Sequence, residues 1–581
     1  MSSQTEFFIF RDSRRSTTAS VLTGRIRTDL QQFPAVPSCD HLVALLLRAG
    51  ELECALCDAK THFAACDRAE KLTDLFAQAA LANDTSAAML DRRSLMVSAQ
   101  SLLDRITCAV PLSVSTPEGF AYYALHPLDY ADVVTRLRLD TASALVLGIR
   151  SIGTTLSAVV VSALRKAGCK AERTTVRPTG DPYERACYFD QAQQQTIAHF
   201  LRSNAAFLVC DEGPGRSGSS LLSVAEALER EGVPRNRIVI LCSHEPDAEA
   251  LCAHDAARRW RQYRFVPAGM TRRLPRNAAQ YLGSGNWRIR LIPEGEPWPA
   301  LWPQMERLRY ASPEARSIFT FEGHGPYGAE VRARNEALAD AGFAPPYFGQ
   351  QAGFGEHSFL AGGIARVDGL DGQLLTRIAR YCAWRSARFA IEDANLSEIA
   401  TMTRVNLERE FGTAAIELEL SVERPALCDA RMMPYNWVRS NDGDWQKFNA
   451  AIHGDDHFFP GPCDIAWDLA GSVVEWDLST SARDFLLAEY QRASGDRISP
   501  RVGSYELAYA TFRMGWSKMA ASSVEPGDEQ DRLLSDYRRY RRWVQKIARL
   551  APLPSDSFPQ RELSGNGPGP DTPSLLALAR S

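Results

Sequence analysis

Two adjacent acids followed by a loop of small residues are the feature of this sequence best suited to chemistry. Asp211 and Glu212 directly follow the apolar run 207–210, and residues 213–220 read Gly-Pro-Gly-Arg-Ser-Gly-Ser-Ser before a helical pattern begins near Leu221. This order predicts a buried strand that leads through a loop into a helix. Carboxylates can accept hydrogen bonds from sugar hydroxyls, and backbone N–H groups at a helix start can bind phosphate. The segment therefore predicts a sugar-phosphate site.

A second segment with the same order of strand, turn and helix comes earlier in the chain. Residues 144–147 are apolar, and Gly148, Arg150, Ser151 and Gly153 follow before another helical pattern. Arg150 offers a positive charge, and the two glycines let the backbone approach a ligand closely. Because ligands of parallel sheets bind at the carboxyl ends of strands, we expect both loops to lie at one edge of a sheet.

Between these two loops, residues 173–185 contain prolines and a glycine that break regular structure. Arg177 and Arg185 in this stretch can bind an anion, and the stretch looks like the mobile lid of the enzyme family named below.

In this order, the three segments resemble the phosphate-binding elements of type I phosphoribosyltransferases over about residues 117–246. The resemblance implies a parallel sheet flanked by helices, 5-phosphoribosyl-1-pyrophosphate (PRPP) as ligand, and Mg²⁺ as cofactor. It also implies displacement of pyrophosphate by an unidentified small-molecule acceptor. The loop 213–220 is one residue longer than is usual in the family, which leaves the register of Ser217 against Ser219 open.

The resemblance carries site residues onto matching positions. It implies catalytic roles for Asp211, Glu212, Arg150, Arg177 and Arg185, Mg²⁺ near Asp211 and Glu212, and PRPP contacts from Gly148, Ser151, Gly153, Gly215, Arg216, Ser217, Gly218, Ser219 and Ser220. Upstream, Tyr122, Tyr123 and His126 either face a planar acceptor or belong to the core.

A second group of acids lies in the C-terminal half. An apolar run at 318–321 precedes a helical pattern with Arg334 and Glu336, and later segments carry Asp429, Asn436, Asp455, Asp456, Asp464 and Asp468. Over about residues 316–550 this order is similar to small-molecule kinases of the aminoglycoside and choline phosphotransferase type. The resemblance implies a kinase-like α+β domain that binds a nucleotide.

Two registers compete within this resemblance. In the preferred one, Glu336 is the helix acid, Asp429 the base, Asn436 a metal ligand, and Asp455 or Asp456 the main Mg²⁺ ligand. In the other, residues 453–457 form the catalytic loop. A separate metal site of Asp455, Asp456, His457 and Asp464 is a third interpretation.

The choice of basic residues bears on kinase activity. No lysine occurs between Lys170 and Lys447, and the run 318–321 offers Thr320 where such kinases place a basic residue. Arg316 or Arg334 would have to substitute, although guanidinium and ammonium groups differ in reach and geometry. We therefore expect Mg²⁺-dependent ligand binding with little phosphoryl transfer.

The elements that must position these residues need several domains, because 581 residues exceed one hydrophobic core. We expect a helical N-terminal region at 1–110, the phosphoribosyltransferase-like domain at 111–246, a connecting segment at 247–313, the kinase-like domain at 314–550 and a flexible tail at 551–581. Cys54, Cys57, His62 and Cys66 have nearly the spacing of a zinc knuckle, but a helical pattern there would spread them over different faces.

The composition favours an ordinary globular protein. The net charge of −4 gives no strong nucleic-acid signal, and no apolar run has the length of a membrane span. We expect a cytoplasmic protein with reduced cysteines, and a homodimer remains one alternative. The leading function is a PRPP-dependent phosphoribosyltransferase. The alternatives are a PRPP-sensing regulator without transfer activity and a small-molecule kinase with a PRPP-sensing front domain.

Overall fold

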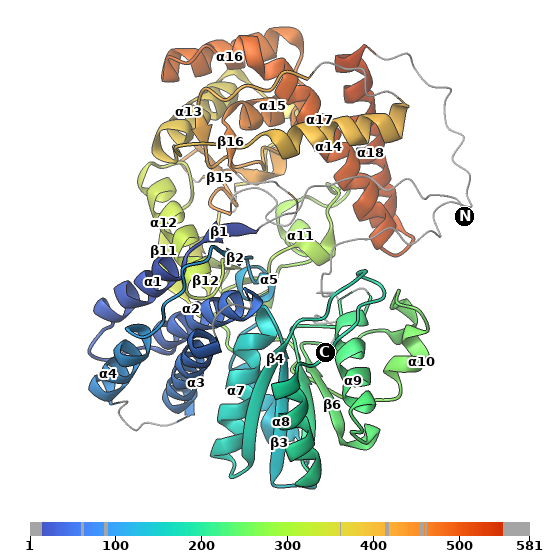
Figure 1. Ribbon diagram of the computed structural model, residues 1–581. Coiled ribbons are helices and arrows are strands. Elements are labelled where there is room, and N and C mark those ends of the chain that lie inside the picture. Colours follow the sequence, from blue (N-terminus) through green and yellow to red (C-terminus); the bar gives the residue numbers. More distant parts are fainter. Residues whose placement is uncertain are drawn as a thin grey trace.

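The computed structural model describes residues 14–59, 63–85, 91–215, 217–360, 362–412, 418–440, 442–452, 458 and 462–549. Figure 1 shows two halves. N-terminal helices and a parallel sheet, coloured from blue to green, form the lower half, and an antiparallel sheet with a group of helices forms the upper half. Among the described helices, none is long and apolar enough to cross a membrane.

The N-terminal region is helical and shares a core with the parallel-sheet unit. It contains α1 (Ala19–Gln31), α2 (Cys39–Asp58), α3 (Phe63–Thr85) and α4 (Arg92–Leu103), with β1 (Arg15–Thr17) paired to β2 (Leu112–Val114). Leu46 of α2 and Phe76 of α3 belong to the same buried cluster as Leu156 and Val160 of α7 (Ile152–Lys166). These helices therefore cover one face of the sheet.

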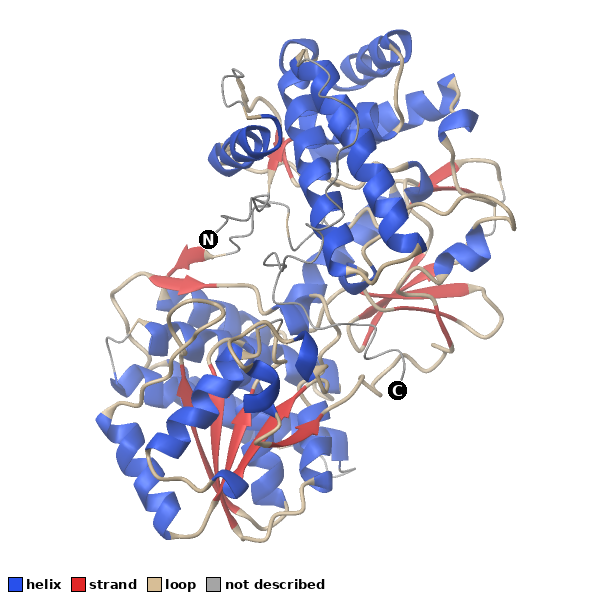
Figure 2. Ribbon diagram, turned by 90° about the vertical axis from the view of Figure 1, so that its right-hand side faces the viewer, coloured by secondary structure: helices blue, strands red, loops and turns tan. Residues whose placement is uncertain are grey.

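The parallel sheet has five strands, which Figure 2 shows between two layers of helices. Its order is β4 (Lys170–Val176), β3 (Ser143–Ile149), β5 (Ala206–Cys210), β6 (Ile238–Cys242) and β7 (Arg264–Pro267). Alternate residues point to opposite faces. Val146 and Leu208 pack toward α7, whereas Leu147 and Val209 share a cluster with helices α8 (Gln191–Arg202) and α9 (Ser219–Arg230). The predicted α/β class with a parallel sheet is confirmed.

The strand order creates a crevice at one place. From β3 the chain crosses to β4 on one side and then returns to β5 on the other side of β3. The loops after β3 and β5 therefore leave the carboxyl edge in opposite directions. Such a switch point is where open parallel sheets bind ligands.

The antiparallel sheet opens the second half. Its order is β11 (Tyr347–Gln351), β12 (Phe354–Ser358), β10 (Ser317–Phe321), β9 (Arg309–Ala311) and β8 (Gln280–Tyr281), and α12 (Pro326–Asp340) follows β10. The remaining elements are α13 (Gly372–Arg388), α14 (Ser397–Phe411), α15 (Ala466–Glu475), α16 (Thr480–Ser494), α17 (Ser499–Ser523), α18 (Asp528–Ala548) and two ribbons, β13 (Pro425–Ala426) with β16 (Cys463–Asp464) and β14 (Trp437–Arg439) with β15 (Trp445–Lys447).

The segment 247–313, expected to connect two domains, instead belongs to both sheets. It contains α10 (Ala256–Trp260) and β7, which completes the parallel sheet, and then β8, α11 (Trp287–Leu291) and β9, which open the antiparallel one. The expected boundary at 246 thus divides the parallel sheet, and the expected boundary at 314 divides the antiparallel sheet. Strand β7 is short and half-buried, so it lacks the apolar run that marks the other parallel strands.

The aromatic segment before the parallel sheet lies between the two halves. Tyr123 is buried in a cluster with Tyr310, Phe321 and Phe354 of the antiparallel sheet. His126 is buried edge-on against His324, with ring centroids 4.9 Å apart. For His126 this supports the core interpretation, because the ring has no free face for an acceptor.

Candidate functional site

The loop after β5 is held in place through its backbone. The Tyr130 hydroxyl donates to the carbonyl oxygens of Asp211 (2.6 Å) and Glu212 (3.2 Å), and the Ser243 N–H donates to the Glu212 carbonyl (2.6 Å). The side chains of both acids therefore leave from a fixed point at the carboxyl edge. Glu212 lines a small cavity together with Tyr123 and Ser243.

The loop then turns into α9 through left-handed glycines. Gly215 has φ 55° and Gly218 has φ 69°, which glycine adopts without a steric penalty. The Ser217 hydroxyl accepts the Ser219 N–H at 3.2 Å, and the two hydroxyls lie 3.0 Å apart. Both serines are thus at the helix start despite the longer loop. Arg216 lies outside the described residues, and Ser220 stands in the first turn of α9.

The loop after β3 meets the end of β5 at close range. A Cβ on Gly148 would lie 2.3 Å from the Gly153 carbonyl oxygen, and one on Gly153 would lie 2.5 Å from the Cys210 carbonyl oxygen. Between them, Ser151 has φ 106° and ψ −107°. A non-glycine residue held there costs about 1–3 kcal/mol, so the rest of the fold must maintain this conformation.

Two arginines at this edge share one carboxylate from the N-terminal region. Arg150 donates to Asp58 at 3.2 Å, and Arg177 donates to the same carboxylate and, at 2.9 Å, to the Arg150 carbonyl. Asp58 is the last residue of α2, and Cys54 one turn earlier lies 3.3 Å from Arg177. The helical region therefore supplies an anion to the positive charges of the sheet edge.

The segment after β4 forms a small hairpin over the start of α9. Thr179 and Ala186 exchange backbone hydrogen bonds of 2.9 and 2.8 Å, and the Ser219 hydroxyl donates to the Pro182 carbonyl at 2.6 Å. Burial raises the pKa of Asp211 to about 7, while the Glu212 N–H and the Arg177 and Arg185 charges favour its ionised form. Arg185 on this hairpin therefore lies within electrostatic reach of Asp211.

We name this region the sheet-edge site, comprising residues 148–153, 177–186 and 211–220. It brings together all the expected phosphoribosyl-site residues that the structure describes. Two adjacent carboxylates, three guanidinium groups and two helix starts can together hold a hydroxylated, phosphorylated ligand.

A larger cavity, of about 120 Å³, lies between the antiparallel sheet and the helices of the second half. We name it the arginine cleft. Its polar lining residues are Arg290, Glu306, Arg307, Arg309, Arg431, Tyr435, Asn436, Asn449 and Arg513. Its tryptophan and phenylalanine lining residues are Trp287, Trp302, Phe359, Phe448, Phe512 and Trp516.

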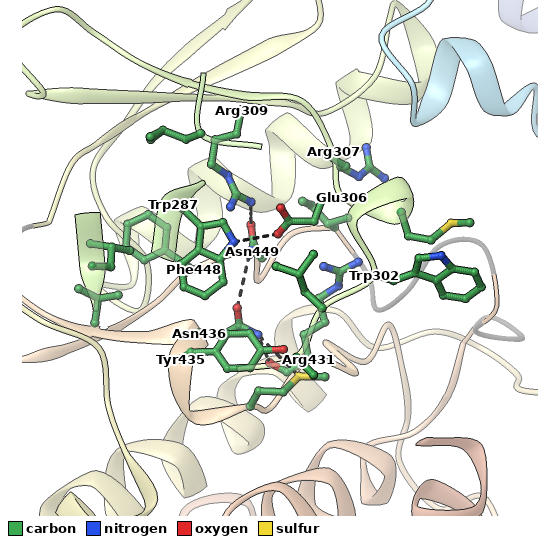
Figure 3. A pocket seen from close by; sticks show the side chains of 18 of the residues that line it. Trp287, Trp302, Glu306, Arg307, Arg309, Arg431, Tyr435, Asn436, Phe448 and Asn449 are labelled. Atoms are coloured by element: carbon green, nitrogen blue, oxygen red, sulfur yellow. Dashed lines mark hydrogen bonds between the residues drawn. The ribbon is translucent and has the colours of Figure 1, made fainter. Parts of the chain in front are cut away.

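Figure 3 shows how these side chains meet. Arg309 of β9 donates to the Asn449 side-chain oxygen at 2.8 Å, and Asn449 in turn donates to Asn436 at 3.4 Å. Asn436 donates to the Arg431 carbonyl at 3.1 Å. A chain of amide and guanidinium groups thus links the sheet to the loop below it.

The expected base, Asp429, is not part of this lining. It is fully buried, forms a 2.9 Å ion pair with Lys447, and accepts a 2.6 Å hydrogen bond from Tyr381. Asp468 accepts the backbone N–H groups of Asp429 and Ala430 at 2.8 and 2.7 Å. These two aspartates hold the loop that presents Arg431 to the cleft, and neither lines the cavity.

Other expected residues of this half also lie apart from the cleft. Glu336 is half exposed beside Arg332, Arg316 is largely exposed, and Arg334 donates to the Ala451 carbonyl at 2.7 Å. Asp464 forms an ion pair with Arg501 at 3.1 Å, so its carboxylate has a structural partner. Asp455, Asp456 and His457 lie outside the described residues, as does His62. In the described part of the chain, no three His, Cys, Asp or Glu side chains are grouped as metal ligands.

Sequence reasoning missed Arg309, Arg431 and Asn449. Arg431 stands two residues after Asp429 and five before Asn436, so its position between two expected site residues was a signal in the sequence. Arg309 lies in the arginine-rich, tryptophan-rich segment that gave no clear pattern. Only the pairing of β9 with β10 places it opposite Thr320, to which it donates at 3.3 Å.

Comparison with known proteins gives a limited result. No family model and no curated protein matches the chain. Solved structures similar to part of it are small-molecule phosphotransferases, over about half of its length. Choline kinase LicA from Streptococcus pneumoniae is 13% identical with a TM-score of 0.28, over 42% of this chain and 90% of that one.

Two further neighbours are of the same kind. A choline kinase from Cryptosporidium parvum is 10% identical, with a TM-score of 0.30 over 45% of this chain and 95% of that one. The GDP complex of aminoglycoside 2′-phosphotransferase-IIIa is 11% identical, with a TM-score of 0.30 over 45% and 98%. A likeness this weak says nothing about activity, which must be inferred from the two sites themselves.

Proposed function

We propose that the protein has two small-molecule sites, a phosphoribosyl-transfer site at the sheet edge and a phosphotransferase-type binding site in the arginine cleft. The observation that carries the first part is the convergence of Asp211, Glu212, Arg150, Arg177 and Arg185 at the switch point of a parallel sheet. The sign and order of these groups suit a ribose that carries phosphate at one end and pyrophosphate at the other.

In this proposal each group has a separate task. The backbone N–H groups and serines at the start of α9 bind the 5-phosphate. Asp211 and Glu212 accept hydrogen bonds from the ribose hydroxyls. Arg150, Arg177 and Arg185 neutralise the pyrophosphate as its bond to C1 breaks and the acceptor forms the new bond to C1. Mg²⁺, when bound near the two carboxylates, supplies further charge neutralisation.

Glu212 has a second task under this proposal. Its side chain lines the small cavity with Tyr123, Ser243 and Thr271, and we propose that the acceptor binds in this cavity. A carboxylate there can hold an acceptor N–H or O–H group and orient its lone pair toward the sugar.

The second candidate function is a small-molecule kinase that works from the cleft. The observation in its favour is a cavity between an antiparallel sheet and a helical lobe, with Asn436 and Asn449 facing each other at its floor. Because Asp429 is enclosed with Lys447, transfer would need a different base. We therefore propose ligand binding there with weak transfer at most, and Asp455 and Asp456 remain the proposed metal ligands.

One experiment separates these functions. The full-length protein is incubated with PRPP, Mg²⁺ and a metabolite extract, and pyrophosphate release and new masses are followed; a parallel sample receives ATP. We expect acceptor-dependent pyrophosphate release that is lost in Asp211→Asn with Glu212→Gln. PRPP binding without release in any extract would favour the regulatory alternative. ATP turnover without pyrophosphate release from PRPP would favour the kinase.

A further inference from the structure

Two cysteines meet where the N-terminal helices approach the sheet-edge site. Cys57 lies in the last turn of α2 and Cys66 in the first turn of α3, and both residues are partly exposed. The Cys57 thiol donates a hydrogen bond to the Cys66 sulfur. Cys54, one turn before Cys57, instead accepts a hydrogen bond from Arg177 at 3.3 Å. Cys57 and Cys66 therefore form a pair of thiols, and Cys54 belongs to the sheet edge.

The surroundings of this pair make Cys66 the more reactive thiol. The hydrogen bond from Cys57 lowers the pKa of Cys66, and the Arg150 charge adds to this effect, whereas burial and the Glu53 carboxylate oppose it. The same hydrogen bond, together with burial, raises the pKa of Cys57. Thiolates are the nucleophiles of disulfide exchange, and reactive cysteines lie in partly exposed, electropositive places. Cys66 can therefore attack a disulfide, and Cys57 is in place to resolve the product.

The second half contains a buried thiol pair that provides a contrast. The sulfur atoms of Cys428 and Cys463 lie 3.5 Å apart, and both side chains are fully buried. Burial raises the pKa of both thiols. A protonated thiol that solvent cannot reach is inert. Proximity alone thus does not make a reactive pair, and exposure and charge distinguish Cys57 and Cys66 from it.

Asp58 links the exposed thiol pair to the sheet-edge site. It follows Cys57 directly and accepts hydrogen bonds from Arg150 and Arg177. Arg150 also donates to the Cys57 carbonyl at 3.3 Å. Because helix ends open at low cost, Asp58 can leave the two arginines when another anion binds them. A covalent link from Cys57 to α3 would remove part of this freedom.

We propose that Cys57 and Cys66 are a redox-active pair that cycles between two thiols and a disulfide by exchange with a low-molecular-weight disulfide. The disulfide holds Asp58 against its two arginines and so weakens the binding of a competing anion; this part rests on the proposed function of the sheet edge. In the exchange, the Cys66 thiolate attacks one sulfur of the small disulfide and releases the other as a thiolate. Cys57, after losing its proton, attacks the Cys66 sulfur and releases the second half. The protein thus loses two electrons and two protons, and the small disulfide becomes two thiols.

Mass spectrometry of the full-length protein tests the exchange. The reduced protein is incubated with oxidised glutathione in EDTA, free thiols are alkylated, and the peptides are mapped. We expect a peptide linked through Cys57 and Cys66 that dithiothreitol reverses, with Cys428 and Cys463 still in the thiol form. Alkylation of Cys66 at pH 7 should be at least about tenfold faster than that of Cys428. In Cys57→Ala a glutathione adduct should remain on Cys66, since no thiol resolves it.

Calorimetry with inorganic pyrophosphate in Mg²⁺ tests the consequence for the sheet edge. We expect the oxidised protein to bind pyrophosphate about three- to tenfold more weakly than the reduced protein, because Asp58 must leave from a helix end that is held more firmly. Asp58→Asn should remove the difference between the two forms. Asp104→Asn, which changes an exposed acid at the end of α4, should keep it.

Each outcome decides one part of the proposal. Cys57 and Cys66 in the thiol form after incubation, or equal alkylation rates for Cys66 and Cys428, would overturn the redox pair. A linked peptide with equal or tighter pyrophosphate binding by the oxidised form would overturn the link through Asp58. No pyrophosphate binding by either form would overturn the proposed function of the sheet edge and with it this link, whereas the peptide map would still decide the thiol exchange.

Discussion

Asp211 and Asp429 each follow a short strand and lead into a loop, but different groups surround them. Asp211 has its charge partners Arg177 and Arg185 on the segment after β4, and its neighbours are backbone N–H groups and a helix start. Asp429 is enclosed by Lys447 and Tyr381 and does not line the cleft. Asp211 thus stands at a sheet edge among groups from other segments, whereas Asp429 is paired inside the core.

Residue type and spacing alone therefore do not distinguish a catalytic acid from a structural one. In both halves the sequence offers aspartates next to small or apolar residues. What differs is whether the counter-charge comes from a separate segment, as that of Arg185 does for Asp211, or from a residue buried with the acid, as that of Lys447 does for Asp429. The second half lines its cavity mainly with arginines instead of these aspartates.

The largest effect should come from breaking the enclosed pair. Lys447→Met leaves Asp429 buried without its partner, which should destabilise the second half by about 3–5 kcal/mol. Thermal unfolding of the full chain measures this. Lys71→Met, which removes an exposed ion pair with Asp67, should cost under about 1 kcal/mol. An unchanged unfolding temperature for Lys447→Met would show that Asp429 is not structurally paired.

Asp211→Asn with Glu212→Gln should have the next largest effect, on binding and not on folding. We expect about a hundredfold loss of PRPP affinity by calorimetry, because two charged acceptors for ribose hydroxyls become neutral. The unfolding temperature should stay near that of the native protein. The control Glu226→Gln lies on α9 and removes a surface pair with Arg259. Unchanged PRPP affinity in the double variant would remove the distinction between the two aspartates.

Asp58→Asn should give a smaller effect of opposite sign. Its carboxylate now satisfies Arg150 and Arg177, so a pyrophosphate must displace it before it can bind both arginines. Neutralising it should raise PRPP affinity about three- to tenfold. Asp67→Asn, on the surface of α3, should leave the affinity unchanged. Weaker PRPP binding in Asp58→Asn would show that Asp58 positions the arginines instead of competing for them.

The smallest effect concerns the stability contributed by Glu70, a mostly buried carboxyl group of α3. Burial raises the pKa of Glu70 to about 7, against the favourable charge of Arg173. The folded state therefore keeps a proton that the unfolded chain loses near pH 4.5, and stability from this group falls as pH rises from about 4.5 to 7. Glu70→Gln cannot titrate, so its unfolding temperature should exceed that of the native protein by about 1–3 °C at pH 8 and match it near pH 4.5. A difference that shrinks as pH rises would contradict this assignment.

Much of the parallel sheet could be predicted from the sequence. Strands β5 and β6 are fully apolar and β3 is apolar after Ser143, so their burial and the loops that follow them could be predicted. Strand β7 could not, because Arg264 and Pro267 break its apolar pattern. The placement of Asp211, Arg150 and Arg177 follows from strand order once the sheet is parallel.

The site in the second half was harder to read for a physical reason. The partner of Asp429 is Lys447, and that of Arg309 is Asn449, which lies 140 positions along the chain. Such pairs depend on how the antiparallel sheet docks on the helices, which local patterns do not encode. Asp58 was missed for the same reason, since its role appears only when α2 meets the loops of the parallel sheet.

The aromatic cluster of Tyr123 with Tyr310, Phe321 and Phe354 has a consequence for how the chain can be divided. A fragment that ends after β7 would expose Tyr123, Ala124 and the ring of His126 to water, and the complementary fragment would expose the back of its sheet. Each fragment would then expose an apolar surface that is prone to aggregation. The two sheets should therefore fold as one cooperative unit, and each half expressed alone should aggregate.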